Sequence, residues 1–535
     1  MTRHLFGLGI WLAAVLPALA LEPNANATAA KPQGPDPYAL SARIDQHIGA
    51  RLKEVGAEPA PLADDYEFLR RAMLDLNGRI PLPTEVYEFV NDKDPYKRRK
   101  LVDKLLDSPG YTIHFTNIWR TILIPETQTN IEVAYLQVGF DNWVRRQLKE
   151  NVPYDKMVRT LLTAQIARNQ RQYYDPFSGQ ESPLTFFQAK EGKPENIAAA
   201  TSRIFMGVNI ECAQCHNHPF ARWSRDQFWN TAAFFAGIER QGPQFYQPLR
   251  EIDDRREIAI PNTDKVVQAA FLDGSEPQWK FQTSSRVTLA DWLTTAENPF
   301  FSRTAVNRMW SQLFGIGIVD PPDDFNDENK PSHPELLDEM AKTFGQAKFD
   351  IKFMLRAIMA SEAYQRTSKQ THSTQSDPRL FAKMPVRAMT GEQLFDSLAT
   401  AVSYRDAFRT QSAVFYGGNN PRQEFISRFN ANAGKPTEAQ TSILQALLLM
   451  NGNFVNGATS VDKSETLAAV ADAPFMNTSR KIETLFFAAL GRKPAKDELD
   501  KLVKFVETGD KAKQKQRLGD VFWTLLNTVE FRVNH

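Results

Sequence analysis

The segment that decides the fold spans residues 194–237 and reads PENIAAATSRIFMGVNIECAQCHNHPFARWSRDQFWNTAAFFAG. Its first part predicts a helix, because Pro194 suits a first turn, apolar residues recur on one face, and Gly207 can end it. Its last part predicts a second helix, which a capping box at Ser224 opens and Gly237 closes. A short segment with the only two cysteines of the chain lies between these helices.

Helical patterns continue on both sides of this segment. The stretch YEFLRRAMLDLNGRI, residues 66–80, has apolar residues at helical spacing and a C-terminal Gly78. Residues 238–285 differ, since REIAIP, KVVQAAFLDG and WKFQTSSRVTL alternate in polarity and are separated by turn residues. The sequence therefore predicts a mainly α protein with two helical domains and a short β-rich insert between them.

Two distant stretches are similar to each other. Residues 74–90 and residues 488–506 both contain Gly-Arg-x-Pro, then an acidic residue, then a helical pattern that ends in Phe-Val. Adjacent repeats would indicate a solenoid, but these copies are far apart. We expect one helix–turn–helix device at both ends of the chain, in which Gly78 and Gly491 close a helix.

The N-terminus has the features of an export signal. A short basic region precedes the apolar stretch Leu5 to Leu16, and Ala18-Leu19-Ala20 fits a cleavage site, which predicts a signal peptide at residues 1–20. Residues 21–37 are rich in Pro, Ala and Asn and predict a disordered tether. No later apolar run approaches a membrane span, so we expect a periplasmic or secreted protein without a membrane span after signal removal.

The overall charge gives no reason to expect a nucleic-acid partner. Lysine and arginine total 64 against 63 acidic residues, for a net charge of +1. Nucleic-acid and anionic membrane surfaces select basic patches, and this balance does not predict one.

The cysteine motif Cys212-Ala213-Gln214-Cys215-His216 has the spacing of c-type haem attachment. Two cysteines about one turn apart can form thioethers to one edge of a haem, and the next residue, His216, can be the proximal iron ligand. His218 is too close along the chain to reach the opposite haem face, so we interpret it as a hydrogen-bonding neighbour or a satisfied buried histidine. The predicted cofactor is one haem c.

Two other interpretations of the motif remain open. In an oxidising compartment Cys212 and Cys215 could form a structural or redox-active disulfide without any cofactor. A zinc site could use both cysteines and His218, although such sites normally take a second ligand pair from elsewhere, and no second cysteine pair exists.

The sixth position of the iron is not decided by the motif. Met206, His114 and Met309 are candidate donors, and each is also suited to an ordinary core position. A methionine ligand would favour electron transfer, whereas an open position would favour chemistry on small ligands.

A second candidate site is the acidic stretch IVDPPDDFNDENKPSHPE. Five acids could collect a hard cation such as calcium: Asp320, Asp323, Asp324, Asp327 and Glu328. The spacing lacks the EF-hand pattern. The alternative is an exposed loop that ends in a capping box, Ser332-His333-Pro334-Glu335.

Long ordered strings in this sequence resemble a known pair of domains. The string TSRIFMGVNIECAQCHNHPFARWSRDQFWNTAAFFAG resembles the planctomycete-type cytochrome-like domain, and FLRRAMLDLNGRIPLPTEVYEFV resembles its start. The string from Asn298, NPFFSRTAVNRMWSQLFGIGIVDPPDDFNDENKPSHPELLDEMAKTF, resembles the companion domain. The resemblance implies an exported protein in which Cys212, Cys215 and His216 form the attachment pattern. It marks as signature positions Asn298, Arg303, Asn307, Arg308 and Trp310, for which it implies no chemistry.

These observations define the expected organisation and function. We expect a cytochrome-like helical domain at residues 38–237, the β-rich insert at 238–285 and the companion helical domain at 286–535. The favoured function is an exported c-type cytochrome-like protein that transfers electrons to an exported redox partner, or acts on small ligands. The alternatives are a haem-free exported binding or scaffold protein with a Cys212–Cys215 disulfide, and an exported polysaccharide-processing component.

Overall fold

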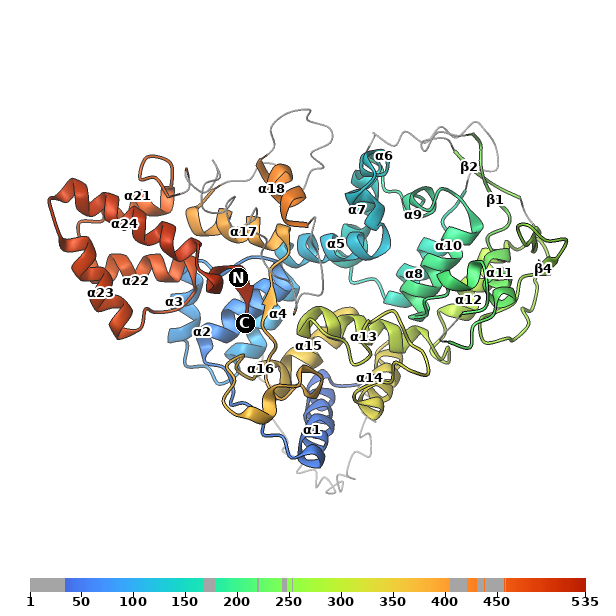
Figure 1. Cartoon of the computed structure of the whole chain (residues 1–535), viewed down its shortest axis with the longest axis horizontal. Helices are drawn as coiled ribbons and strands as arrows, with labels where there is room; N and C mark the ends of the chain where they lie inside the picture. Colours follow the sequence, from blue (N-terminus) through green and yellow to red (C-terminus); the bar gives the residue numbers. More distant parts are fainter. Residues whose placement is uncertain are drawn as a thin grey trace, which may run out of the picture. The chain divides into compact units, whose positions relative to one another are not determined.

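Helices dominate the structure. The computed structural model describes residues 34–166, 179–218, 221–242, 248–252, 254–404, 421–430, 437, 457 and 459–535. The predicted signal peptide and most of the predicted tether lie outside these residues. Residues Pro35–His535 form one compact unit, in which the described strands make three short antiparallel pairs (Figure 1). The mainly α fold class is therefore confirmed.

The first part of the chain is a series of short helices whose ends follow local sequence signals. The first helix, for example, starts after Asp36, whose carboxylate accepts from two backbone N–H groups, and ends at Gly56 with φ 66°. The bounds are α1 Pro37–Val55, α2 Asp65–Asn77, α3 Pro83–Asn91, α4 Lys97–Leu106, α5 Pro109–Leu123, η1 Pro125–Gln128, α6 Ile131–Tyr135, α7 Gln137–Lys149, α8 Tyr154–Leu162 and α9 Thr185–Ala189.

The two helices predicted around the cysteine motif are confirmed. The first is α10, Pro194–Thr201, which continues as the π-helical segment η2, Ser202–Met206, and stops at Gly207 with φ 68°. After the short 3₁₀ segment η3, Glu211–Gln214, comes α11, Arg225–Ala233. The Ser224 capping box opens α11 as expected, but the helix ends at Ala233, before Gly237.

The predicted β-rich insert contains two hairpins. Strand β1, Ile238–Arg240, pairs with β2, Leu249–Glu251, and β3, Glu257–Ala259, pairs with β4, Val266–Gln268. The prediction was wrong for WKFQTSSRVTL, which contains no strand. Helix α12, Ser285–Leu293, begins inside it, because the Ser284 hydroxyl accepts from the Arg286 N–H and caps the first turn.

Helices continue to the C-terminus, where the chain returns to a strand. The bounds are α13 Phe301–Phe314, α14 Pro334–Gln346, α15 Ile351–Ala360, α16 Glu362–Gln365, η4 Ser373–Gln375, η5 Pro378–Leu380, α17 Gly391–Val402, α18 Pro421–Asn430, α21 Glu465–Asp472, α22 Thr478–Ala489, α23 Lys496–Glu507, α24 Lys511–Leu526 and α25 Val529–Arg532. The final strand β6, Val533–Asn534, pairs with β5, Arg387–Ala388. Among the helices of the described residues, none is both long enough and apolar enough to cross a membrane.

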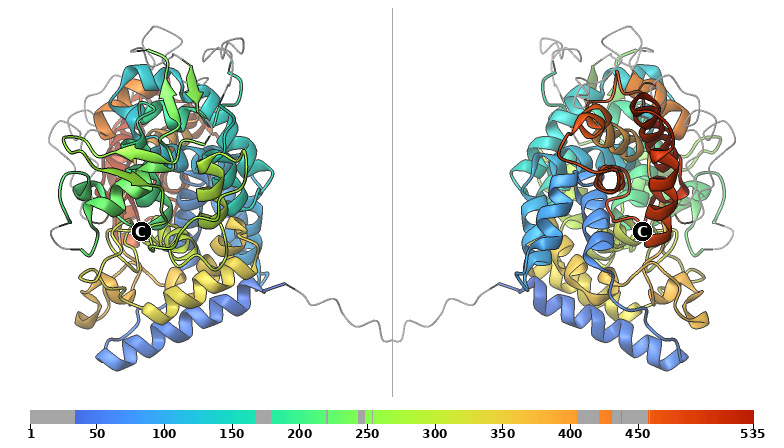
Figure 2. Two further views of the ribbon diagram at one scale, coloured as in Figure 1. Left: turned by 90° about the vertical axis from the view of Figure 1, so that its right-hand side faces the viewer. Right: turned by 90° about the vertical axis from the view of Figure 1, so that its left-hand side faces the viewer.

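The hydrophobic core joins helices from both sides of the β-rich insert. One cluster of buried residues extends from Leu40 to Met384, and Figure 2 shows α1 beside α14 and α15 within it. The rings of Tyr154 and Phe301, for instance, stack with centroids 5.0 Å apart. A second cluster runs from Leu394 to Phe531 and also includes Leu74 and Ile80. The two helical regions therefore share the first cluster, while the second belongs mainly to the C-terminal helices.

The similar stretches near the two ends adopt the same local structure, which confirms the expected shared device. Gly78 and Gly491 have φ of 67° and 69°, where glycine avoids steric strain. After each glycine an arginine forms two parallel hydrogen bonds with a glutamate in the next helix. Arg79 bonds Glu85 at 2.9 Å, and Arg492 bonds Glu498 at 2.8 and 3.0 Å.

Helix α2 carries a buried polar network that holds distant parts of the chain together. The Asp75 carboxylate, 1 % exposed, accepts hydrogen bonds from the Tyr364 hydroxyl at 2.8 Å, Arg387 at 3.0 Å and the Asn534 amide at 2.7 Å. The buried Arg71 donates to the Tyr364 carbonyl and to the terminal His535 carbonyl. A buried charge is tolerated only with such compensation, so these contacts position the C-terminus on α2.

We expect Asp75→Ala to lower the free energy of unfolding by about 3–5 kcal/mol, because it leaves the buried Arg387 guanidinium without its carboxylate. Asp500→Ala removes the same charge from an exposed position of α23 and should change stability by less than about 0.5 kcal/mol. Urea denaturation followed by circular dichroism compares the two. Equal losses would show that the Asp75 network does not stabilise the fold.

Candidate functional site

The cysteine motif lies at the surface, on the segment between η2 and α11. Cys212 and Cys215 are both exposed and free. Two contacts fix the segment to the protein. Ala213 is completely buried, and the Trp229 indole N–H of α11 donates to the Gln214 carbonyl at 3.1 Å. With Ala213 buried, the two thiols on either side of it are exposed to solvent.

His216 is exposed as well, and one of its ring nitrogens already has a partner. Its Nδ1 lies 2.8 Å from the Asn217 carbonyl oxygen. When Nδ1 donates to this carbonyl, the Nε2 nitrogen carries the lone pair and can bind a metal. Asn217 is in turn tied to α11, because its side-chain oxygen accepts from the Arg225 N–H at 2.9 Å.

His218 organises the loop that follows the motif. Its backbone N–H donates to the Trp223 carbonyl at 2.8 Å, and its Nδ1 accepts from the Ala221 N–H at 3.0 Å. The half-buried imidazole therefore closes a turn. Whether His218 also lies beside a haem stays a prediction.

The three candidates for a sixth iron ligand lie on three different elements. Met206 ends η2 and is 1 % exposed, and Met309 is buried on α13. His114 is buried on α5 and packs against Gly78, where an added Cβ would meet its ring at 2.5 Å. Met206 is the candidate nearest to the motif along the chain.

Two signature residues of the companion segment shape α13 and its surroundings. The side-chain oxygen of Asn298 accepts from the N–H groups of Phe300 and Phe301 and so caps α13. Asn307, fully buried, exchanges two hydrogen bonds with the backbone of Val319. Both amides satisfy backbone groups that burial would otherwise leave unpaired.

The other signature residues pack and pair at helix surfaces. Arg303 bonds Asp338 of α14, and Trp310 is completely buried. Arg308 donates to the Arg203 and Ile204 carbonyls at 2.9 and 3.1 Å, where the π-helical turn leaves backbone oxygens without helical partners. Burial lowers the pKa of Arg308, and the nearby Asp323 partly offsets this effect.

The acidic loop is paired and internally bonded. Asp323 lies 3.3 Å from Arg203 and 3.7 Å from Arg308, so two arginines pair with this loop. The Asn326 side-chain oxygen accepts from the N–H groups of Glu328 and Asn329. Among the described residues, which include all five acids and both cysteines, no three His, Cys, Asp or Glu side chains converge as metal ligands.

The capping box predicted at the end of the acidic loop is wrong. The N-cap of α14 is His333, and its side chain makes no cap hydrogen bond. The Ser332 hydroxyl instead bonds the Ile318 carbonyl at 3.3 Å, because the loop folds back on that backbone. Pro334 occupies the first turn as expected.

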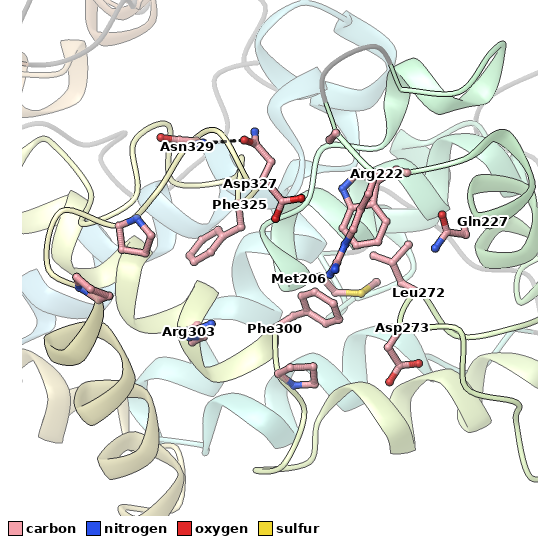
Figure 3. A pocket seen from close by; sticks show the side chains of 16 residues that line it. Met206, Arg222, Gln227, Leu272, Asp273, Phe300, Arg303, Phe325, Asp327 and Asn329 are labelled. Atoms are coloured by element: carbon pink, nitrogen blue, oxygen red, sulfur yellow. Dashed lines mark hydrogen bonds between the residues drawn. The ribbon is translucent and has the colours of Figure 1, made fainter.

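A cavity of about 610 Å³ lies beside the loop that His218 closes. Its walls come from three parts of the chain: η2 with residues 221–227, the connection after β4, and α13 with the acidic loop. Figure 3 shows side chains from all three parts around the same space. They include Met206, Arg222, Leu272, Phe300, Arg303, Phe325 and Asp327. Of these, the sequence had singled out only Met206, Arg303 and Asp327, because the other four follow no recognisable spacing.

These features define a mainly helical protein with a surface Cys-x-x-Cys-His motif and an adjacent cavity. Residues 43–240 match the family model PSCyt2, a protein of unknown function (DUF1549), and residues 285–414 match PSD1, a protein of unknown function (DUF1553). The chain thus carries these two domains in the planctomycete-type pairing. No curated protein and no solved structure matches the chain.

The buried His333 should make stability depend on pH. Burial, followed by the positive charges of Arg51 and His47, lowers the pKa of His333 to about 4. The unfolded chain, with an ordinary histidine pKa near 6.5, therefore binds a proton first as the pH falls. The stability contributed by neutral His333 is complete above pH 6.5 and is lost towards pH 4, by at most about 3 kcal/mol.

We expect His333→Gln to flatten the decrease in stability between pH 7 and pH 4. Denaturant unfolding at several pH values measures this slope. His372→Gln is the control, because His372 is exposed. A slope that His333→Gln leaves as steep as in the unchanged protein would contradict the assignment.

Proposed function

We propose that this protein is an exported, c-type cytochrome-like protein that carries one haem on Cys212 and Cys215, with His216 as the proximal ligand. The observation that carries the proposal is the arrangement of the motif. Two exposed thiols lie three residues apart, Cys212 on the 3₁₀ segment η3 and Cys215 just after its end. The following imidazole has Nδ1 on a backbone carbonyl and Nε2 available for iron. The sequence features of export support the same function.

The residues present suit the attachment chemistry. Both thiols are accessible to the maturation machinery that would join them to the haem vinyl groups. The hydrogen bond from His216 to Asn217 is the kind that fixes a ligand ring and its tautomer. The haem would supply a reversible one-electron carrier, and the protein residues would hold it and tune its potential.

The surface position of the motif favours electron transfer over chemistry on small ligands. Because Cys212, Cys215 and His216 are all exposed, a haem joined to them would keep an edge at the protein surface. An exposed edge shortens the path to an exported redox partner. Reactions of small ligands usually depend on an enclosed distal pocket, which controls access and polarity.

The haem-free alternative uses the same two cysteines. Their exposure on one segment also suits a redox-active or structural Cys212–Cys215 disulfide in an oxidising compartment. The protein would then be an exported binding or scaffold protein. The two functions differ in whether the cysteines carry a covalent haem, which can be measured directly.

Expression in a host with c-type maturation machinery tests the proposal. We expect a Soret band and an intact mass raised by one haem, both absent from the Cys212→Ala/Cys215→Ala variant. His216→Ala should keep or lower the covalent adduct but change the spectrum, since the proximal ligand is lost. The matched control His372→Ala should leave the spectrum unchanged.

The opposite outcome is equally clear. Colourless protein whose mass lacks the two thiol hydrogens, and which reacts with thiol reagents only after reduction, would replace the haem proposal with the disulfide alternative. Periplasmic fractionation of the native host tests export separately.

A further inference from the structure

We propose that the cavity beside the motif belongs to a groove that binds a linear oligosaccharide. A second hollow of about 590 Å³ adjoins the 610 Å³ cavity, and the two share Pro299 and Arg303 in their walls. We call these two hollows together the α13 groove. The inference does not depend on haem attachment, because neither cysteine nor His216 lines either hollow.

The first hollow combines aromatic surfaces with hydrogen-bonding groups of both kinds. Phe300 and Phe325 are half-buried and both line this hollow, and Figure 3 draws their rings among the side chains around it. Arg222 is a donor, Asp327 an acceptor, and Asn329 offers both. A sugar ring has the matching surface, since its C–H faces pack on aromatic rings and its hydroxyls both donate and accept.

The charge of the groove argues against simpler ligands. In the first hollow Arg222 and Arg303 are balanced by Asp273 and Asp327, so the site has no excess positive charge for a phosphate or sulfate alone. A lipid chain would leave these polar groups without partners, which is costly. The hydroxyl groups of a sugar can donate to the aspartates and accept from the arginines at the same time.

The second hollow extends the site. Ser302, Asp338, Lys342 and Gln346 contribute to its wall, and none of its described lining residues is aromatic. Arg303 stands between the hollows, held by a 2.6 Å hydrogen bond to Asp338. Two hollows in succession suit a chain of several sugar units. A bound peptide would usually add to a sheet edge or present a helix, and no strand of the described residues lines either hollow.

The walls of the groove are formed before any ligand binds. The Phe325 N–H donates to the Gly207 carbonyl at 2.8 Å, and the Phe325 ring lies so close to Gly207 that a Cβ there would be 2.6 Å away. The Asn329 amide is tied to the Asp324 carbonyl at 2.9 Å. Such preorganisation lowers the entropy lost on binding.

Affinity electrophoresis of the full chain tests the proposal, in gels that contain xylan or laminarin. We expect at least one polymer to retard the protein, and oligosaccharides from that polymer to bind in calorimetry. Arg222→Ala and Asp327→Ala should each weaken binding about tenfold, because each removes a hydrogen bond to a charged group.

Matched controls lie next to these residues. Lys330→Ala and Glu328→Ala change exposed charges of the same loop that do not line the groove, and they should bind as the unchanged protein does. Cys212→Ala/Cys215→Ala should bind the polymer as the unchanged protein does, because the cysteines do not line the groove. The proposal is wrong if no polymer retards the protein, or if the groove variants and the loop controls bind equally well.

Discussion

The buried carboxylate of Asp75 is the constraint on which the rest of the structure depends. It accepts hydrogen bonds from residues 289, 312 and 459 positions away along the chain. A buried charge without such partners would be strongly destabilising, so α16, β5, β6 and α2 must assemble together. The same helix buries Arg71, which binds the terminal carbonyl of His535. Asn534 and His535 are thereby held against α2.

A second device recurs through the helices. In three places a hydroxyl residue caps a helix, bonds the carbonyl three residues earlier and accepts from the N–H of an aromatic residue three positions later. The hydroxyl–aromatic pairs are Ser108 with Tyr111, Ser361 with Tyr364, and Thr528 with Phe531. All three aromatic side chains are buried. Together with the paired Gly-Arg turns, these caps let many short helices pack at defined angles without long loops.

The two proposed sites share one structural support. The His218 N–H donates to the Trp223 carbonyl, and Trp223 lines the cavity, so this hydrogen bond links the end of the motif to the cavity wall. Arg308 holds the π-helical turn of η2 from the companion region, and Phe325 packs on the glycine that ends this turn. Residues of the two family regions are therefore in direct contact at η2 and Gly207. This arrangement explains how the companion region can contribute to a binding site although its signature residues mainly cap, pair and pack.

The sequence by itself determined what depends on neighbours along the chain. Helical periodicity, the Gly207 stop, the Ser224 capping box and the repeated Gly-Arg turn are local, and each appears where it was expected. The spacing of the cysteine motif is also a local feature. The capping box predicted at Ser332 was wrong, because the Ser332 hydroxyl donates to the Ile318 carbonyl instead. Only the tertiary structure decided which polar residues are buried, as for Asp75 and Arg71. It alone brought Arg222, Phe300 and Asp327 around one cavity, since their contacts join segments that no spacing rule relates.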